Sequence, residues 1–171
     1  MDPKTRVLNC IKRTGPDRLP VKHHLSEGID EEICRMYGIS DQEEFLSFLG
    51  DDFRYVQPER LKPGDSAECF DYTVIPSQID KAGSVAIVTG YSNHLSCINE
   101  VAELRLGFEQ TMVDIAFEDP DYLEIVRSMT DFYYDHFRSI LDQGSGRIDI
   151  VHIGDDFGGQ EGLLISPGSF R

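Results

Sequence analysis

Two short apolar runs on either side of a long amphipathic segment constrain the fold of this chain most. Residues 85–89 are almost entirely apolar, which is typical of a strand buried on both faces. Residues 148–153 form a second apolar run, which predicts another buried strand. Between the two runs, residues 120–143 carry apolar side chains at helical spacing, behind Asp119 as N-cap and Pro120 as first helical residue. This order predicts two parallel strands joined by a helical crossover, and hence a mostly parallel sheet.

Shorter elements are expected in the rest of the chain. Apolar residues at helical spacing predict helices over residues 3–13, 29–37, 41–49 and 97–117, the last interrupted near Gly107. The third of these helices should bury one stripe, made of Phe45, Leu46, Phe48 and Leu49. Residues 53–56 and 70–75 predict further strands, the second of them inside an irregular, proline-rich and glycine-rich connection over residues 57–83. We therefore expect three to five strands in one domain that spans residues 1–171.

The charge balance and the apolar runs exclude several classes of protein. The chain carries 31 acidic and 16 basic residues, a formal net charge of −15. Neutralising phosphates requires clustered Lys and Arg, so we expect neither a nucleic-acid partner nor binding to an anionic membrane. The apolar runs are far shorter than the roughly 20 residues that span a bilayer. With no signal-peptide pattern at residues 1–21, we predict a cytoplasmic protein whose four scattered cysteines form no disulfide framework.

The acidic loop after residues 148–153 is the strongest candidate site. Asp155 and Asp156 follow that strand directly, and Gln160 lies shortly after them. In parallel α/β folds the carboxyl ends of the strands carry the chemistry, so we expect the two aspartates to act in catalysis and Gln160 to contact substrate. The alternative is a loop in which aspartate serves as a turn or N-cap residue. Further on, Ser166 is expected to cap another helix.

Histidines and a cysteine in other loops are weaker candidates. His23 and His24 follow the predicted first extended segment, so at least one side chain should reach the same end of the sheet and bind substrate, ligate metal or move protons. An exposed pair is the alternative. His94 and Cys97 form an H-x-x-C pair after residues 85–89, but two ligands do not define a zinc site. We therefore predict no metal site from these residues.

Three loop residues complete the predicted site. Glu59 lies just past the strand predicted at residues 53–56 and is a catalytic candidate. Tyr91 and Asn93 lie in the loop after residues 85–89 and are expected to line the substrate pocket. His152, inside a strand pattern, is expected to be a core histidine.

Several segments, in the same order along the chain, resemble the uroporphyrinogen decarboxylase superfamily. Residues 154–171, GDDFGGQEGLLISPGSFR, resemble its G-D-D-x-G-x-Q-x-G-x-x-I-S-P-x-x-F-R segment, in the form found in the corrinoid-linked methyltransferase-like branch. Residues 6–21 resemble the N-terminal helix with its D-R-x-P-V motif. Residues 104–116 resemble the L-R-G-F-E helix, and residues 117–137 resemble the helix that follows it.

This resemblance implies a (β/α)8 TIM barrel and an enzyme of porphyrin biosynthesis or of methyl transfer. Members of the superfamily are either lyases, which decarboxylate uroporphyrinogen, or corrinoid-dependent methyltransferases. The implied partners are a tetrapyrrole or methyl-donor substrate and a corrinoid protein, and zinc is implied only for a full-length methyltransferase-type relative. The decarboxylases carry an arginine-bearing M-R-Q-A-G-R stretch after the P-V of the first strand, where residues 22–28 here read KHHLSEG. Because arginine forks bind carboxylates, their loss argues against a polycarboxylate substrate.

The resemblance covers about the first half of such a barrel and lacks the H-x-C…C zinc motif of the methyltransferase branch. We therefore expect a partial, mostly parallel sheet with helices, encoded by a truncated or split gene. The protein is expected to be inactive alone and to bind no cofactor. An alternative is a non-catalytic half-barrel that self-associates or complements a partner half through its open sheet edges. A small metal-binding module is a third hypothesis.

Overall fold

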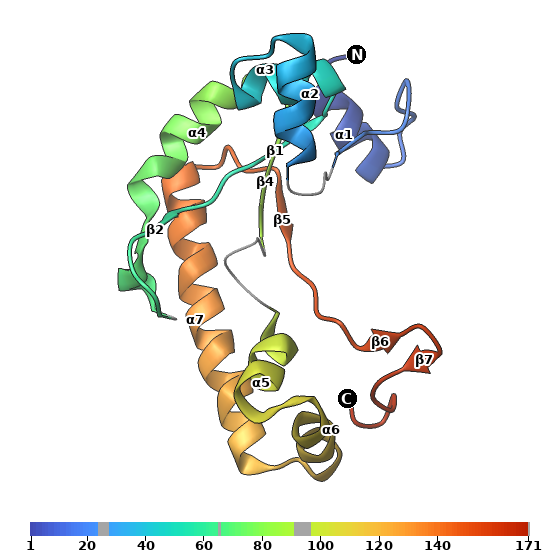
Figure 1. The fold of residues 1–171 in the computed structure, drawn as a ribbon, viewed down its shortest axis with the longest axis vertical. Coiled ribbons are helices and arrows are strands. Elements are labelled where there is room, and N and C mark those ends of the chain that lie inside the picture. The colour runs from blue at the N-terminus through green and yellow to red at the C-terminus, as the bar shows by residue number, and fades with distance from the viewer. Residues whose placement is uncertain (24–27, 65, 91–96, 171) are drawn as a thin grey trace. The chain divides into compact units, whose positions relative to one another are not determined.

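The computed structural model describes residues 1–23, 28–64, 66–90 and 97–170, which form a mixed α/β chain (Figure 1). The α-helices are α1 (Pro3–Ile11), α2 (Ile29–Tyr37), α3 (Gln42–Leu49), α4 (Ile75–Ala82), α5 (Ile98–Leu106), α6 (Phe108–Phe117) and α7 (Pro120–Gly144). The strands are β1 (Phe53–Tyr55), β2 (Glu59–Arg60), β3 (Phe70–Asp71), β4 (Ala86–Gly90), β5 (Ile150–His152), β6 (Gly158–Gly159) and β7 (Gly162–Leu163). Two 3-10 turns, η1 (Ala67–Cys69) and η2 (Tyr72–Val74), flank β3. Within the described ranges, no helix is long and apolar enough to cross a membrane.

Three strands form the predicted parallel sheet, in the order β1–β4–β5. Phe53 pairs with Ala86 and Tyr55 with Val88. Every residue of β4 is buried, which confirms the strand predicted at residues 85–89. The other described strands, each two residues long, form two antiparallel pairs, β2–β3 and β6–β7. The closed barrel remains a prediction, because three parallel strands do not make one.

The strand β5 departs from the prediction of a buried strand. It lies at the edge of the sheet, and its last two residues are exposed. Val151 is 41% exposed, and Ile153, just beyond the strand, is 63% exposed. His152 is exposed too, so the prediction of a core histidine was wrong. The apolar run predicted a strand correctly, but it could not show that, among the described strands, β5 would have β4 as its only neighbour.

The connection over residues 57–83 also differs from expectation. Residues 70–75 were expected to form one strand, yet β3 ends at Asp71, and η2 then leads into α4. Pro76 stands in the first turn of α4, where its fixed φ and missing N–H suit the start of a helix. Burial of Ile75 and Ile79 on one face of α4 then favours the helix over an extended chain.

Most helix boundaries follow the capping signals in the sequence. Asp41 accepts the Glu44 N–H at 2.8 Å and begins α3, and the Asp121 N–H donates to Asp119 at 2.9 Å at the start of α7. The predicted buried stripe of α3 was only partly correct. Phe45 is buried, but Phe48 is 53% exposed and its ring lies 4.9 Å from that of Tyr37. Ser166 accepts the Ser169 N–H at 3.0 Å, as an N-cap would, but the described residues there form a turn.

The chain divides into two compact units. The first comprises Met1–Gln57, Thr73–Thr89 and Leu141–Val151. In this unit the fully buried carboxylate of Asp52, just before β1, accepts hydrogen bonds from Arg6 at 2.6 Å and from Arg18 at 2.7 Å. Burial raises the pKa of Asp52, but a hydrogen bond from the Val21 N–H, followed by those from Arg18 and Arg6, holds it below its usual range. The network therefore ties the N-terminal segment to the sheet.

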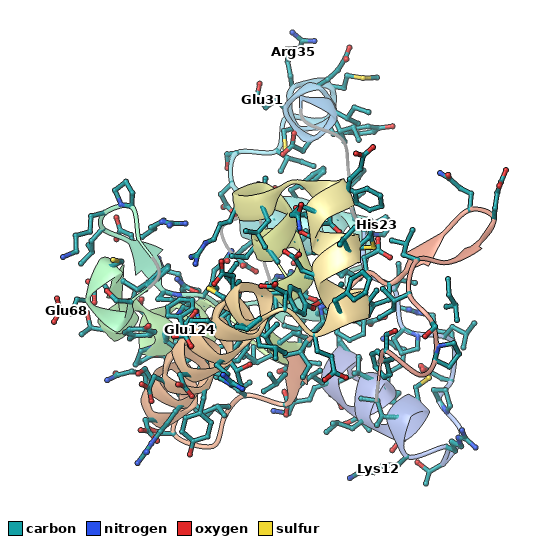
Figure 2. The ribbon with its side chains drawn as sticks, turned by 90° about the horizontal axis from the view of Figure 1, so that it is seen from below. Lys12, His23, Glu31, Arg35, Glu68 and Glu124 are labelled. Atoms are coloured by element: carbon teal, nitrogen blue, oxygen red, sulfur yellow. The ribbon has the colours of Figure 1, made fainter. Side chains whose placement is uncertain are left out.

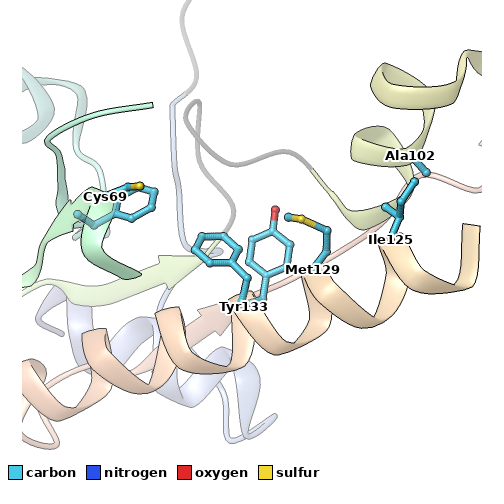
Figure 3. Close-up of a cluster of buried hydrophobic side chains, with 7 residues drawn as sticks. Cys69, Ala102, Ile125, Met129 and Tyr133 are labelled. Atoms are coloured by element: carbon cyan, nitrogen blue, oxygen red, sulfur yellow. The ribbon is translucent and has the colours of Figure 1, made fainter. Parts of the chain in front are cut away.

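The second unit comprises Pro58–Tyr72, Gly90–Ile140 and His152–Arg171. Its core is a cluster of apolar side chains: Cys69, Phe70, Ala102, Ile125, Met129, Phe132 and Tyr133. Figure 3 shows Ile125, Met129 and Tyr133 pointing from one side of α7, as their helical spacing requires. Full burial of side chains of this size stabilises a fold by about 1.5–3 kcal/mol each.

Candidate functional site

Asp155 lies in the loop after β5 and is held by the start of helix α5. Its Oδ2 accepts the backbone N–H of Asn99 at 3.0 Å. The N-cap residue of α5, Cys97, makes no capping hydrogen bond of its own, so a carboxylate distant in sequence satisfies an N–H group in the first turn. Both residues belong to the second unit. Asp155 therefore has a structural role, and the helix dipole favours its negative charge.

Asp156 is positioned by the backbone of its own loop. Its N–H donates to the Oδ1 of Asp155 at 3.0 Å, and its Oδ1 accepts the N–H of Gly158 at 3.4 Å. The residue is exposed, so its carboxylate remains accessible to a ligand. The two adjacent aspartates thus divide their roles, since one caps a helix while the other stays available.

A cavity of about 310 Å³ lies within the second unit between α5, α6 and the loop after β5. Its lining residues are Cys97, Asn99, Glu100, Glu103, Phe108, Asp155, Asp156 and Leu164. Four of these eight residues are carboxylates, and none is Lys or Arg. Phe108 and Leu164 supply the apolar part of the wall. The cavity therefore has a strongly negative wall beside an apolar one.

Asn99 is the most deeply buried polar residue of this wall, at 2% exposed. Its Nδ2 donates to Glu103 Oε1 at 2.8 Å, one helical turn further along α5. Its Oδ1 is buried and, among the described residues, accepts no hydrogen bond. An unsatisfied buried acceptor costs about 1–3 kcal/mol, which makes this oxygen an unusual feature of the cavity wall.

The acidic wall affects two neighbouring groups that titrate. Burial raises the pKa of the Cys97 thiol, and the charges of Asp155, Glu100 and Asp156 raise it further. Burial also raises the pKa of Tyr122, with a smaller contribution from Asp155. Cys97 is therefore a neutral thiol at physiological pH, and not the thiolate that nucleophilic attack requires.

The structure places the other predicted residues elsewhere or does not describe them. His23 Nδ1 contacts the Oδ1 of buried Asp51, two residues before β1 and thus at the amino end of that strand. Glu59 is exposed on β2, and Gln160 is exposed between β6 and β7. His24, Tyr91 and Asn93, like His94 of the H-x-x-C pair, lie outside the described residues. Of the predicted site residues that the structure describes, only Asp155 and Asp156 line the cavity together.

The described residues include no group of three or more His, Cys, Asp or Glu side chains that could hold a metal ion. The zinc implied for a methyltransferase-type relative therefore has no fitting ligand set in this part of the chain, and we assign no step to it.

The sequence did not single out Asn99, Glu100 or Glu103 as cavity residues. They occupy the first turns of α5, and their signal was present: Glu100 and Glu103 follow Cys97 at intervals of three residues, as acidic residues near a helix N-terminus often do. What the sequence could not show was that the loop after β5 closes over this helix end.

A second polar pair, Tyr72 and His136, lies in the core of the same unit. The Tyr72 hydroxyl and His136 Nδ1 are 2.8 Å apart, and His136 is 1% exposed among the rings of Phe70, Phe132 and Phe137. Burial lowers the pKa of His136 to about 4 and raises the pKa of Tyr72 to about 12. Both side chains are therefore neutral at physiological pH.

No protein-family model, no curated protein and no solved structure matches this chain.

Proposed function

We propose that the chain belongs to the uroporphyrinogen decarboxylase superfamily and that the loop after β5 forms part of its substrate pocket. The observation that carries this proposal is the order of the parallel sheet. β1, β4 and β5 are neighbours in the order in which they occur along the chain, and the acidic loop follows β5 directly. In a (β/α)8 barrel each strand pairs with the next, and the active site lies at the carboxyl ends of the strands.

The charge of the cavity favours the methyltransferase-like branch over the decarboxylases. Uroporphyrinogen carries many carboxylates, and the four carboxylates of the described lining, which includes no Lys or Arg, would repel it. The replacement of the arginine-bearing stretch by residues 22–28 points the same way. We therefore propose that the protein takes part in corrinoid-dependent methyl transfer.

Within this proposal the two aspartates have different roles. Asp155 positions the loop by capping α5, and Asp156 orients a substrate through its accessible carboxylate. Cys97 offers the cavity no thiolate, and the described residues include no metal ligand set for the chemical step. We therefore expect ligand binding, without turnover, by the isolated 171-residue chain.

Absorbance titrations test the proposal. Hydroxocobalamin should bind the chain saturably, and coproporphyrin, a tetrapyrrole with four carboxylates, should bind more weakly. Asp156→Asn should weaken hydroxocobalamin binding, whereas Glu124→Gln, on the exposed face of α7 in Figure 2, should not. Failure of hydroxocobalamin to bind, or tighter binding of coproporphyrin, would count against the methyltransferase-like assignment.

A second candidate function, self-association or pairing with a complementary half, is favoured by the exposed edge of the sheet. β5 is an edge strand, and the apolar side chains of Val151 and Ile153 are 41% and 63% exposed. Such an edge is a template for pairing with another strand. Sedimentation of the purified chain decides: a dimer that dissociates in Val151→Lys supports this function, and a concentration-independent monomer contradicts self-association.

A further inference from the structure

We infer that Gln78 of α4 closes the outer edge of the parallel sheet at the carboxyl end of β1, and that without this contact two copies of the chain pair through that edge. In the order of the described strands, β1–β4–β5, β1 stands at one end, so its outer edge lies at the margin of the sheet. Such a margin is a template for a further strand unless something occupies it. Gln78 and β1 belong to the same compact unit.

The backbone of Gln57 points toward this outer edge. The Val56 N–H donates to the carbonyl of Val88 in β4 at 2.9 Å, so the pairing of the two strands continues one residue beyond the end of β1. Successive residues of a strand direct their N–H and C=O groups to opposite edges. Because Val56 faces β4, the N–H and C=O of Gln57 face away from β4, where a neighbouring strand would bind them.

The side chain of Gln78 takes the place of that neighbouring strand. Its Oε1 accepts the Gln57 N–H at 3.0 Å, and its Nε2 donates to the Gln57 carbonyl at 2.9 Å. A residue of a paired strand would supply the same two groups, one acceptor and one donor. A primary amide carries both groups on one side chain, which a carboxylate or an ammonium group does not. Gln78 therefore imitates one residue of a strand and excludes a real strand from this position.

Other contacts occupy the same edge further back along the chain. Arg54 Nη1 donates to the carbonyl of Phe53 at 2.8 Å, and Arg54 is itself buried. Just before β1, the Asp52 N–H donates to the carbonyl of Val21 at 2.9 Å. Arg54 and Asp52 also take part in buried ion pairs, whereas Gln78 is uncharged and half-buried. Gln78 is therefore the contact that a conservative substitution can remove while the fold is kept.

A second copy of the chain is the partner that fits the opened edge. Every copy presents the same edge, and two identical edges related by a two-fold axis pair in antiparallel orientation. A contact of this kind uses the same surface on both copies, so it closes at a dimer and does not grow into a filament.

Sedimentation velocity and amide hydrogen exchange of the whole chain test this inference with Gln78→Met, which keeps the length of the side chain and removes the amide. Every variant also carries Val151→Lys, so that pairing through the β5 edge does not contribute. We expect the Gln57 amide to exchange about fivefold faster at low protein concentration, and the chain to dimerise as the concentration rises. Gln143→Met, the same substitution at an exposed glutamine of α7, should change neither property.

Gln78→Glu separates the loss of this contact from a loss of folding. Its carboxylate still accepts the Gln57 N–H but repels the same group on a second copy, so this variant should exchange slowly at Gln57 and stay monomeric. Three results would overturn the inference: a Gln78→Met chain that is monomeric at every concentration, unchanged exchange at Gln57, or equal dimerisation of Gln78→Glu. Hydroxocobalamin binding tests the proposed function separately, and none of these three results affects it.

Discussion

His136 should make the stability of the chain depend on pH in the range where few other groups titrate. It is 1% exposed and neutral in the folded state, where burial lowers its pKa from 6.5 to about 4. In the unfolded chain it returns to its ordinary pKa. Below pH 6.5 the unfolded state therefore binds more protons than the folded state, and the stability present above that pH is lost as the pH falls through about 4.

The size of this effect follows from the displacement of the pKa. The shift corresponds to a loss of roughly 3 kcal/mol when complete and of about 2 kcal/mol between pH 7 and pH 5. Small domains have total stabilities of about 5–15 kcal/mol, so the loss should be easy to measure.

Urea unfolding at pH 7, 6 and 5 measures the effect, with His136→Gln as the variant that cannot titrate. His136→Gln should be less stable than wild type at pH 7, and the difference should shrink by about 2 kcal/mol at pH 5. His152→Gln, the same substitution at an exposed histidine, serves as the matched control. Parallel pH profiles for wild type and His136→Gln, or an NMR titration midpoint of His136 near 6.5, would refute the reasoning.

Three further substitutions test the packing of the chain, each by the free energy of urea unfolding. Asp155→Ala should cost about 1 kcal/mol because α5 loses its cap, and an unchanged stability would contradict that role. Gly90→Ala should cost about 1–3 kcal/mol or more, because a Cβ there would overlap the backbone carbonyl of His152. Gly146 has open space around it, so Gly146→Ala is the control that measures the cost of backbone strain alone. Met129→Ala should cost about 2–5 kcal/mol through the cavity it leaves in the core of the second unit, and a cost below 1 kcal/mol would show that this cluster is not packed.

Local signals in the sequence predicted many of the helices and the central strand. Asp119 and Pro120 marked the start of α7, and the apolar run at residues 85–89 marked β4, because capping and continuous burial depend on neighbouring residues. The exposure of Phe48 and of β5 could not be predicted in this way. Burial of an apolar stripe depends on which element packs against it, and the sequence of the stripe alone does not contain that information.

In the candidate site, too, local sequence predicted some features, and others depend on the tertiary fold. Asp155 and Asp156 were predicted from their place after a strand, and the structure assigns Asp155 the capping role that had been the alternative. The contact of Asn99 in α5 with Asp155 joins residues 56 apart in sequence, and the contact of Tyr72 with His136 joins residues 64 apart. Such contacts arise from the tertiary fold, so spacing rules within one element do not reveal them.

An NMR titration of the chain with hydroxocobalamin tests most directly whether the loop after β5 is part of a substrate pocket. The backbone amides of Asn99, Asp156 and Gly158 connect this loop to α5 and to itself, so ligand binding there should shift all three. We predict saturable shifts of these amides together, weakened in Asp156→Asn. Saturable shifts elsewhere that leave these three amides unchanged, or no shifts at all, would contradict the assignment.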